Sequence, residues 1–345
     1  MSSPVILAVN AGSGTIKIGA FTYDAEQREL ARSVWTATDH AVVEAVLGEA
    51  RKWKIGAIGH RLVHGGPDYA TSVRITPEVL VALSTLVPFA PNHLPAALAL
   101  IGTLSETFPS VPQVACFDTA FHATLPPEAR RLPVPTRYAQ RGIRRYGFHG
   151  LSCRYAIDEL RRTAGDSVAR GRVAIAHLGN GSSVTATRDG ESRDTTMGFT
   201  PIGGVIMATR TGDMDPGALT YIARLEGWTP DQLEDMSSHQ SGLAAIAEGV
   251  GDMQSLLSRE QSDESARLAI DMYVISVAKA IAGSAAVLGG LDGIVFTGGI
   301  GEHAAAIRQR ICDRLDFLDA WVRVIPANEE LVIARDTWHV VKGAS

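Results

Sequence analysis

A strand, a glycine-bearing turn and a returning strand occur twice in this sequence, at residues 5–21 and again at residues 173–188. In each copy an apolar, β-branched run is interrupted by two glycines and followed by a second strand-like run. Two strands joined by a short glycine-containing turn are typical of a β-hairpin. Repetition of this unit indicates an internal duplication and therefore predicts two related domains, each with its own sheet.

Helical patterns separate the strands, which places the chain in the α/β class. A chain of 345 residues is long enough for two domains with separate cores. After Gly298–Glu302, which is expected to be a turn, an amphipathic helix should bring four apolar residues to one face, namely Ile307, Ile311, Leu315 and Leu318. Other helices are predicted at residues 41–53, 77–86, 94–108 and 268–289, and other buried strands at residues 114–117 and 293–297.

Composition excludes several classes of protein. A net charge of -5 leaves no basic footprint for nucleic acid, so no nucleic-acid partner is expected. The three cysteines lack CxxC spacing and indicate reduced thiols in a cytoplasmic protein. The run Val5–Val9 is too short for a signal peptide. The apolar stretch at residues 270–290 contains Asp271 and Lys279 and is predicted to be a buried helix, not a membrane span.

The first turn carries groups that suit phosphate. It reads Asn10-Ala11-Gly12-Ser13-Gly14-Thr15 and is followed by Lys17. Glycines let backbone N–H groups approach phosphate oxygens, while hydroxyls and a lysine add donors and positive charge. The Walker A pattern is absent, and a plain hairpin turn explains this segment equally well.

Two further glycine turns follow strands. His177–Ser183 (HLGNGSS) contains the Asn-Gly pair of a tight hairpin, and Gly298–Glu302 lies between a strand and a helix, where helix N-terminal amides collect anions. Three such turns together favour a nucleotide site more than any one alone. The absence of HExxH, GxSxG, paired CxxC and a GxGxxG after a strand argues against hydrolases of the zinc and serine types and against a Rossmann dehydrogenase.

Four charged or imidazole residues are candidates for chemistry. Arg61 could recognise a carboxylate or phosphate through two N–H groups, although a structural ion pair explains it as well. Asp118 follows a buried strand, where functional acids are common, and could also cap the next helix. His149 lies between two glycines, which should leave its ring accessible. Arg210 stands in a polar segment with no partner at helical spacing.

These segments together resemble the acetate kinase family. The matching motifs occur in family order and span nearly the whole chain: ILAVNAGSGTIK (6–17), HRLVHGG (60–66), FDTAFHAT (117–124), YGFHGLS (146–152), HLGNGSS (177–183), residues 196–216, FTGGIGE (296–302) and NEELVIARDT (328–337). The resemblance implies two duplicated actin-like ATPase (ribonuclease H-like) domains with a nucleotide cleft between them, and a homodimer. The domains would be residues 1–118 with 331–345, and residues 119–330.

The resemblance also implies a role for each matching residue. Asp118, His149 and Arg210 would be catalytic, and Asn10 and Glu329 would bind Mg²⁺, with Mn²⁺ able to substitute. Residues around the carboxylic acid would be Arg61, His93, Val63, Phe148 and Pro201. ATP or ADP would contact Thr15, Lys17, His177, Leu178, Gly179, Asn180, Gly181, Asp252, Met253, Gln254, Gly301, Glu302, His303, Ala304 and Ala305.

The implied chemistry agrees with this inventory. A carboxylic acid with a pKa of about 4 to 5 is already ionised at pH 7 and needs no general base to attack phosphorus. The difficulty is to bring two anions together, which calls for Arg, His⁺ and a cation. Asp118 is therefore expected to orient a metal, a water or an arginine and not to remove a proton.

The sequence departs from the family in three places. It is shorter before Arg61 and between Leu318 and Val324, which we interpret as trimmed surface segments. Asn92 stands where the acyl pocket usually has an apolar residue, which favours a propionate, butyrate or other short-chain kinase as an alternative, unless Asn92 turns away. Asp252-Met253-Gln254 replaces the usual Asp-Phe-Arg near the base. A pyrophosphate-linked relative and a nucleotide-binding regulator without transfer are further alternatives; Gly301 argues against the first and the combined polar residues against the second.

Overall fold

The computed structural model describes residues 3–11, 15–36 and 39–343, with only the backbone course given for residue 36 and residues 39–42. The chain divides into two compact units. Unit 1 comprises Met1–Ala123, Gly150–Tyr155 and Asn328–Ser345, and unit 2 comprises Thr124–His149 and Ala156–Ala327. The turn residues Gly12, Ser13 and Gly14 lie outside the described residues.

Unit 1 is built on a mixed six-stranded sheet of order β3-β2-β1-β4-β6-β5. The first three strands run antiparallel, whereas β4 and β6 run parallel to β1. This arrangement confirms the first predicted hairpin. The strands are β1 (Val5–Ala11), β2 (Thr15–Thr22), β3 (Glu29–Thr36), β4 (Ile55–Leu62), β5 (Val73–Arg74) and β6 (Gln113–Phe117).

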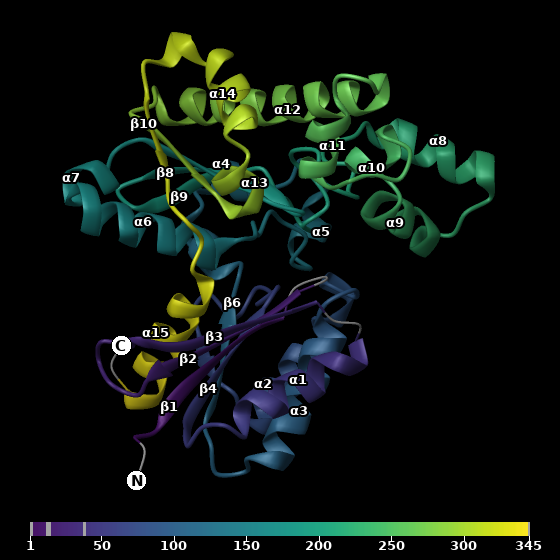
Figure 1. Ribbon diagram of the computed structural model, residues 1–345. Helices are drawn as coiled ribbons and strands as arrows, with labels where there is room; N and C mark the ends of the chain where they lie inside the picture. The colour runs from purple at the N-terminus through teal and green to yellow at the C-terminus, as the bar shows by residue number, and fades with distance from the viewer. Residues whose placement is uncertain (1–2, 12–14, 37–38, 344–345) are drawn as a thin grey trace. The chain divides into compact units, whose positions relative to one another are not determined.

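Helices cover both faces of this sheet (Figure 1). Leu7 and Val9 of β1 pack with α1 (Asp39–Ala50) and α3 (Leu94–Thr107), while Ile6 and Ala8 point the other way and pack with α15 (Glu329–Lys342). The close approach of α15 to β4 requires Gly59, because a Cβ there would collide with Thr337 and Ile333. The remaining short elements are α2 (Pro77–Ser84), η1 (Val87–Phe89) and η2 (Ala120–Thr124).

Unit 2 repeats the sheet plan of unit 1. Its five strands have the order β11-β10-β7-β8-β9, with β7, β8 and β9 antiparallel in sequence and with β10 and β11 parallel to β7. This order matches β6-β4-β1-β2-β3 strand for strand, which confirms the duplication predicted from the two hairpins. The strands are β7 (Val173–Leu178), β8 (Ser182–Arg188), β9 (Glu191–Thr195), β10 (Gly293–Thr297) and β11 (Trp321–Val324).

The long helix α12 (Glu264–Leu288) forms the core of unit 2 on one face of the sheet, and Figure 1 shows α6 (Gly150–Ala164) on the other. By length and apolar composition α12 resembles a membrane span, but Tyr273, Val277 and Ile281 are buried against the sheet and its neighbours, as expected for a core helix. The other helices are α4 (Pro127–Arg130), α5 (Thr136–Ala139), α7 (Asp166–Ala169), α8 (Pro216–Glu226), α9 (Pro230–His239), α10 (Gly242–Ile246), α11 (Met253–Arg259), α13 (Gly298–His303), α14 (Ala305–Asp313) and η3 (Asp316–Leu318).

The helix predicted to carry Ile307, Ile311, Leu315 and Leu318 is shorter in the structure than expected. The helix after the third glycine turn ends at Asp313, so Leu315 and Leu318 lie beyond it, and Gly298–Glu302 is itself helical instead of a simple turn. Leu315 is nevertheless buried in the same core. The spacing of apolar residues therefore predicted correctly that Leu315 is buried. It did not predict where the helix ends, because a residue can be buried without being helical.

The buried histidine His60 of β4 should make the folded protein less stable at acid pH. His60 is bonded to Gln113 at 2.6 Å, and burial lowers its pKa to about 4. Since the unfolded chain binds the proton near pH 6.5, the stabilisation is complete above that pH and is lost as the pH falls towards 4, by up to about 3 kcal/mol. Urea unfolding at pH 7.5, 6 and 5 should show this loss, and His60→Gln should lack that part of it. Equal pH dependence in both proteins would contradict the assignment.

Candidate functional site

Unit 1 brings four predicted residues into one hydrogen-bonded cluster. Arg61, in β4, donates to Oδ2 of Asp118 through Nε at 2.9 Å and Nη2 at 2.6 Å, and to Oδ1 of Asn10 through Nη1 at 3.1 Å. Asn10 ends the buried part of β1, and its Nδ2 donates to Oε2 of Glu329 at 2.7 Å. Neighbouring parallel strands end at this edge of the sheet, which is why residues far apart in sequence meet there.

The orientation of the Asn10 amide follows from its partners. Its Nδ2 faces a carboxylate oxygen of Glu329 and one of Glu330, each at 2.7 Å. An ionised carboxylate accepts hydrogen bonds and cannot donate them. Its Oδ1 faces Arg61, which only donates. The amide oxygen therefore points to the Arg61 side of the cluster and the amide nitrogen to the two glutamates.

The electrostatics of the cluster are those of a buried pair of opposite charges. Burial raises the pKa of Asp118, while the charge and hydrogen bonds of Arg61 oppose that shift. Burial would lower the pKa of Arg61, but the carboxylates of Asp118, Glu329 and Glu330 raise it above its ordinary value. Arg61 therefore stays protonated. Removing one partner of such a pair leaves an uncompensated buried charge.

The other predicted residues of unit 1 are more dispersed. Val63 is buried just past β4, and His93 is half-buried at the start of α3. Lys17 is half-buried and Thr15 exposed on β2. Asn92, which would disturb an apolar pocket, is exposed.

In unit 2 the two predicted histidines lie together. The rings of His149 and His177 are stacked with centroids 4.2 Å apart, and Nδ1 of His149 shares a hydrogen bond with Ser183 Oγ at 3.0 Å. Flanking glycines predicted an accessible ring, but His149 is only 8% exposed, and these two contacts are part of its packing. Its φ of 58° is left-handed, which costs a non-glycine residue energy and is common at functional sites.

Arg210 lies against the same turn. A Cβ on Gly181 would come within 3.3 Å of His149 Nε2 and 3.4 Å of Arg210 Nη1, so the glycine lets both side chains approach the loop. The guanidinium donates to the carbonyl of Pro201 at 3.1 Å. Phe148, next to His149, is fully buried. Unit 2 thus assembles an arginine, two imidazoles and a glycine turn.

The predicted nucleotide contacts fall into two groups. The strand-end turns meet, since a Cβ on Gly298 would strike the backbone of Leu178 and one on Gly179 would lie 3.9 Å from the amide nitrogen of Gly299. Glu302 accepts from the amides of Gly298 and Ala327, and Asn180, His303 and Ala305 are exposed. In contrast, Asp252 caps α11, Gln254 is exposed and Met253 is buried in the core. The remaining members, Gly301 and Ala304, lie in and just after α13.

Three residues in these clusters were not predicted from the sequence. Glu330 is 1% exposed and bonded to Asn10, Arg32 of β3 donates to Glu330 at 3.0 Å, and Ser183 touches His149. Glu330 could have been predicted, because it is a second carboxylate directly after Glu329. Ser183 could also have been predicted, because it belongs to the matched motif at residues 177–183. No local pattern distinguishes Arg32, because its partner is far away in the sequence.

A divalent cation suits the unit 1 cluster. Asn10 and Glu329 offer amide and carboxylate oxygens, and Oδ1 of Asp118 is buried with no hydrogen-bond partner in the part of the chain that the structure describes. Such an oxygen would be satisfied by a metal-bound water. Among those residues no group of three or more His, Cys, Asp or Glu forms a ready-made cage. An ion with few protein ligands, completed by waters and substrate oxygens, is the Mg²⁺ pattern.

Comparison with known proteins decides the family. The acetokinase family model matches residues 42–323, which is well over half of the chain. The chain belongs to the acetokinase family. An acetokinase member named acetate kinase, from Rhodopseudomonas palustris, is 40% identical over 315 residues, covering 84% of this chain and 78% of that relative.

Solved structures of acetokinases agree with this assignment. An acetate kinase from Porphyromonas gingivalis has a TM-score of 0.86 at 30% identity, and a propionate kinase from Francisella tularensis has a TM-score of 0.88 at 32% identity. Each comparison covers 98% of this chain and 100% of the other. The actin-like ATPase fold of these kinases is therefore the fold of this acetokinase, as predicted.

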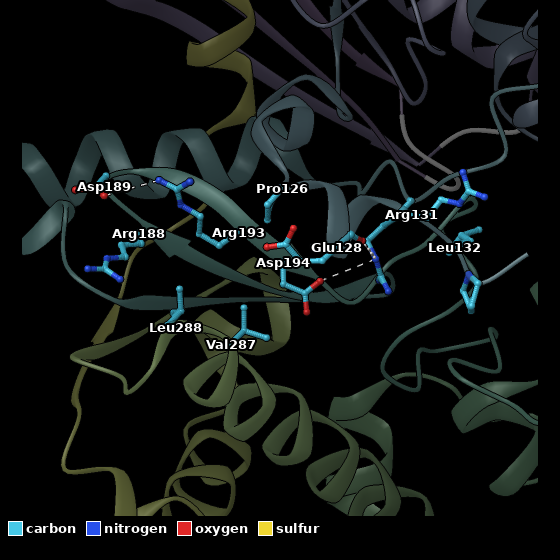
Figure 2. Close-up of a pocket in the computed structure, with 13 residues that line it drawn as sticks. Pro126, Glu128, Arg131, Leu132, Arg188, Asp189, Arg193, Asp194, Val287 and Leu288 are labelled. Carbon is cyan, nitrogen blue, oxygen red and sulfur yellow. Dashed lines mark hydrogen bonds and ion pairs between the residues drawn. The ribbon is translucent and has the colours of Figure 1, made fainter. Parts of the chain in front are cut away.

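This acetokinase also has a cavity of about 620 Å³ within unit 2, lined by none of the predicted site residues (Figure 2). Arg188 lines it at the end of β8, Asp189 in the turn that follows, Val287 and Leu288 at the end of α12, and Glu128 in α4. Its wall carries both arginines and carboxylates, so it selects no single charge of ligand.

Proposed function

We propose that the protein is an acetate kinase, which transfers the γ-phosphoryl group of ATP reversibly to acetate by direct in-line attack and forms acetyl phosphate and ADP. The observation that carries this proposal is the cluster of Arg61, Asp118, Asn10 and Glu329, found in a chain of the acetokinase family. It combines a cation that can hold a carboxylate with oxygen donors that can hold a metal ion.

Arg61 is proposed to bind the carboxylate of acetate. Its Nε and one Nη2 hydrogen are committed to Asp118, which fixes the plane of the guanidinium and leaves further N–H groups for substrate. Asp118 accepts these bonds and so orients Arg61. No proton needs to be removed from acetate, because the acid is ionised at neutral pH.

His149 and Arg210 are proposed to stabilise the charge that develops on the phosphoryl oxygens. Both lie at the Gly181 turn, and donors fixed in advance cost no reorganisation during the reaction. The glycine turn at residues 177–181 and the glycine-rich start of α13 at residues 298–302 are proposed to take the nucleotide phosphates through backbone N–H groups.

We propose Mg²⁺ as the cation, held by Asn10 and Glu329. When bound, the ion withdraws negative charge from the phosphoryl oxygens. Mn²⁺ prefers the same octahedral oxygen ligands and is expected to replace it. We also propose a cytoplasmic homodimer as the working form.

The size of the acyl group is the open part of this proposal. Val63, Phe148 and Pro201 supply apolar surface, and the exposure of Asn92 removes one argument against acetate. The propionate kinase from Francisella tularensis is as similar in structure as the acetate kinase from Porphyromonas gingivalis, which keeps propionate or another short acid as the alternative.

A comparison of kcat/KM among short carboxylic acids tests which of them is the preferred substrate. Purified protein with ATP and Mg²⁺ is given formate, acetate, propionate or butyrate in turn, and acyl phosphate is trapped with hydroxylamine. We expect the highest kcat/KM for acetate. A higher value for propionate or butyrate would reassign the substrate, and no hydroxamate with any acid would refute a carboxylate kinase.

A further inference from the structure

Arg32 forms hydrogen bonds with residues on both sides of Glu329, the glutamate proposed to bind the metal ion. It lies on the edge strand β3, and its Nε and Nη2 donate to the two oxygens of Glu29 at 3.0 and 2.7 Å. Its Nη1 donates to Oε2 of Glu330 at 3.0 Å, and its Nη2 also donates to Oδ1 of Asn328 at 2.7 Å. Only a planar fork of N–H groups can reach three side chains in this way.

The two inner partners of Arg32 hold the first turn of α15. Asn328 is the N-cap of this helix, and its Oδ1 accepts from the amide of Leu331 at 3.2 Å as well as from Arg32. Glu330 is buried and uses its other oxygen, Oε1, to accept from Asn10 at 2.7 Å. Glu329 stands between these two anchored residues in the chain, so its backbone cannot shift without breaking one of the bonds.

The two adjacent glutamates at the start of α15 differ in their charge partners. Glu329 and Glu330 are adjacent carboxylates, and Arg32 forms an ion pair with Glu330. Glu330 accepts from both Arg32 and Asn10, so its charge is matched by Arg32 and its orientation is fixed. Glu329 accepts from Asn10 through Oε2 and is the carboxylate proposed to hold the cation.

We propose that Arg32 is a positioning residue for the cation site: by clamping Asn328 and Glu330 it holds the backbone of Glu329 and, through Glu330, the side chain of Asn10, the two residues proposed to bind Mg²⁺. This inference rests on the proposed function for the identity of the site. Outer partners that orient metal ligands typically account for a 10- to 100-fold difference in metal affinity or activity. The hydrogen bonds of Arg32 go to Glu29, Asn328 and Glu330, none of which is proposed to bind substrate or metal.

The test compares Arg32→Met and Arg32→Lys with Arg28→Met, an arginine just before the same strand that is exposed. For each protein we would measure the Mg²⁺ concentration at half-maximal rate, the KM of acetate, the melting temperature, and Mn²⁺ binding with ADP from the electron paramagnetic resonance signal of free Mn²⁺. We expect Arg32→Met to weaken Mn²⁺ binding and raise the Mg²⁺ requirement about 10- to 100-fold. Acetate KM should change little.

Two further comparisons separate positioning from folding. Arg32→Lys keeps the charge but not the fork and should restore Mn²⁺ binding only in part, and Glu29→Gln should keep most of it because the inner contacts remain. Wild-type Mn²⁺ binding in Arg32→Met, or an equal loss in Arg28→Met, would overturn the proposal. If Arg32→Met does not fold, full Mn²⁺ affinity in Arg32→Lys would overturn it. If wild-type protein forms no acyl phosphate, the Mn²⁺ comparison still decides the role of Arg32.

Discussion

Replacing Asp118 with asparagine is expected to lower kcat on the order of 10²- to 10³-fold, the cost of losing a preorganised charged group. Both bonds from Arg61 go to the same oxygen of Asp118, so an amide oxygen could still accept them, but the amide carries no negative charge and leaves the arginine charge uncompensated in a buried cluster. Arg61 would then be held less firmly. Binding of ADP should be nearly unchanged, because the segments proposed to take the nucleotide phosphates belong to unit 2, whereas Asp118 belongs to unit 1.

A matched variant separates this effect from lost stability. Asp336 of α15 is also buried and pairs with Arg154 at 2.7 Å, in the same unit but outside the cluster. Asp336→Asn should reduce the free energy of unfolding and leave kcat near the wild-type value. Steady-state rates, ADP titration and urea unfolding of both variants provide the measurement. Near-normal turnover in Asp118→Asn would rule out the assigned role.

Arg210→Lys is expected to reduce kcat by about 10²- to 10³-fold, although the charge is retained. Lysine lacks the planar fork that can serve two oxygens at once, and its ammonium would not reproduce the bond to the Pro201 carbonyl that orients Arg210. Since the loss is proposed to occur in the transition state, kcat and kcat/KM should fall together.

The control for Arg210 is another arginine of unit 2. Arg310 forms an ion pair with Glu260 away from the glycine turns, so Arg310→Lys should keep normal kcat. A rise in acetate KM with unchanged kcat in Arg210→Lys would instead assign Arg210 to substrate binding alone.

The duplicated architecture could be predicted because its signal is local. Each hairpin is indicated within about 20 residues by two apolar runs and a glycine turn, so the β1–β2 and β7–β8 hairpins could be predicted from the sequence. The strands β3, β4, β5, β9 and β11 were not recognised. Four of them lie at sheet edges, where fewer residues need to be buried, and the central strand β4 carries two glycines and two polar residues that interrupt its apolar pattern. The end of α14 was also missed, because a buried residue such as Leu315 keeps the apolar spacing after the helix stops.

The site was predictable only in part for a related reason. Arg61 and Asp118 were each recognised, but their pairing depends on β4 and β6 lying side by side. The bond from Arg32 to Glu330 spans 298 positions in the sequence and follows from the packing of α15 on the sheet. No spacing within a short window contains that information. The stacked histidines likewise depend on how the segment before α6 meets β7.

The most direct measurement is a phosphorus NMR spectrum of the wild-type protein with ATP, Mg²⁺ and acetate. The account predicts loss of the γ-phosphate signal of ATP in step with appearance of acetyl phosphate and ADP. It also predicts the reverse when ADP and acetyl phosphate are supplied, and little of either reaction with Asp118→Asn. Release of inorganic phosphate without acetyl phosphate, or unchanged ATP, would contradict phosphoryl transfer to acetate.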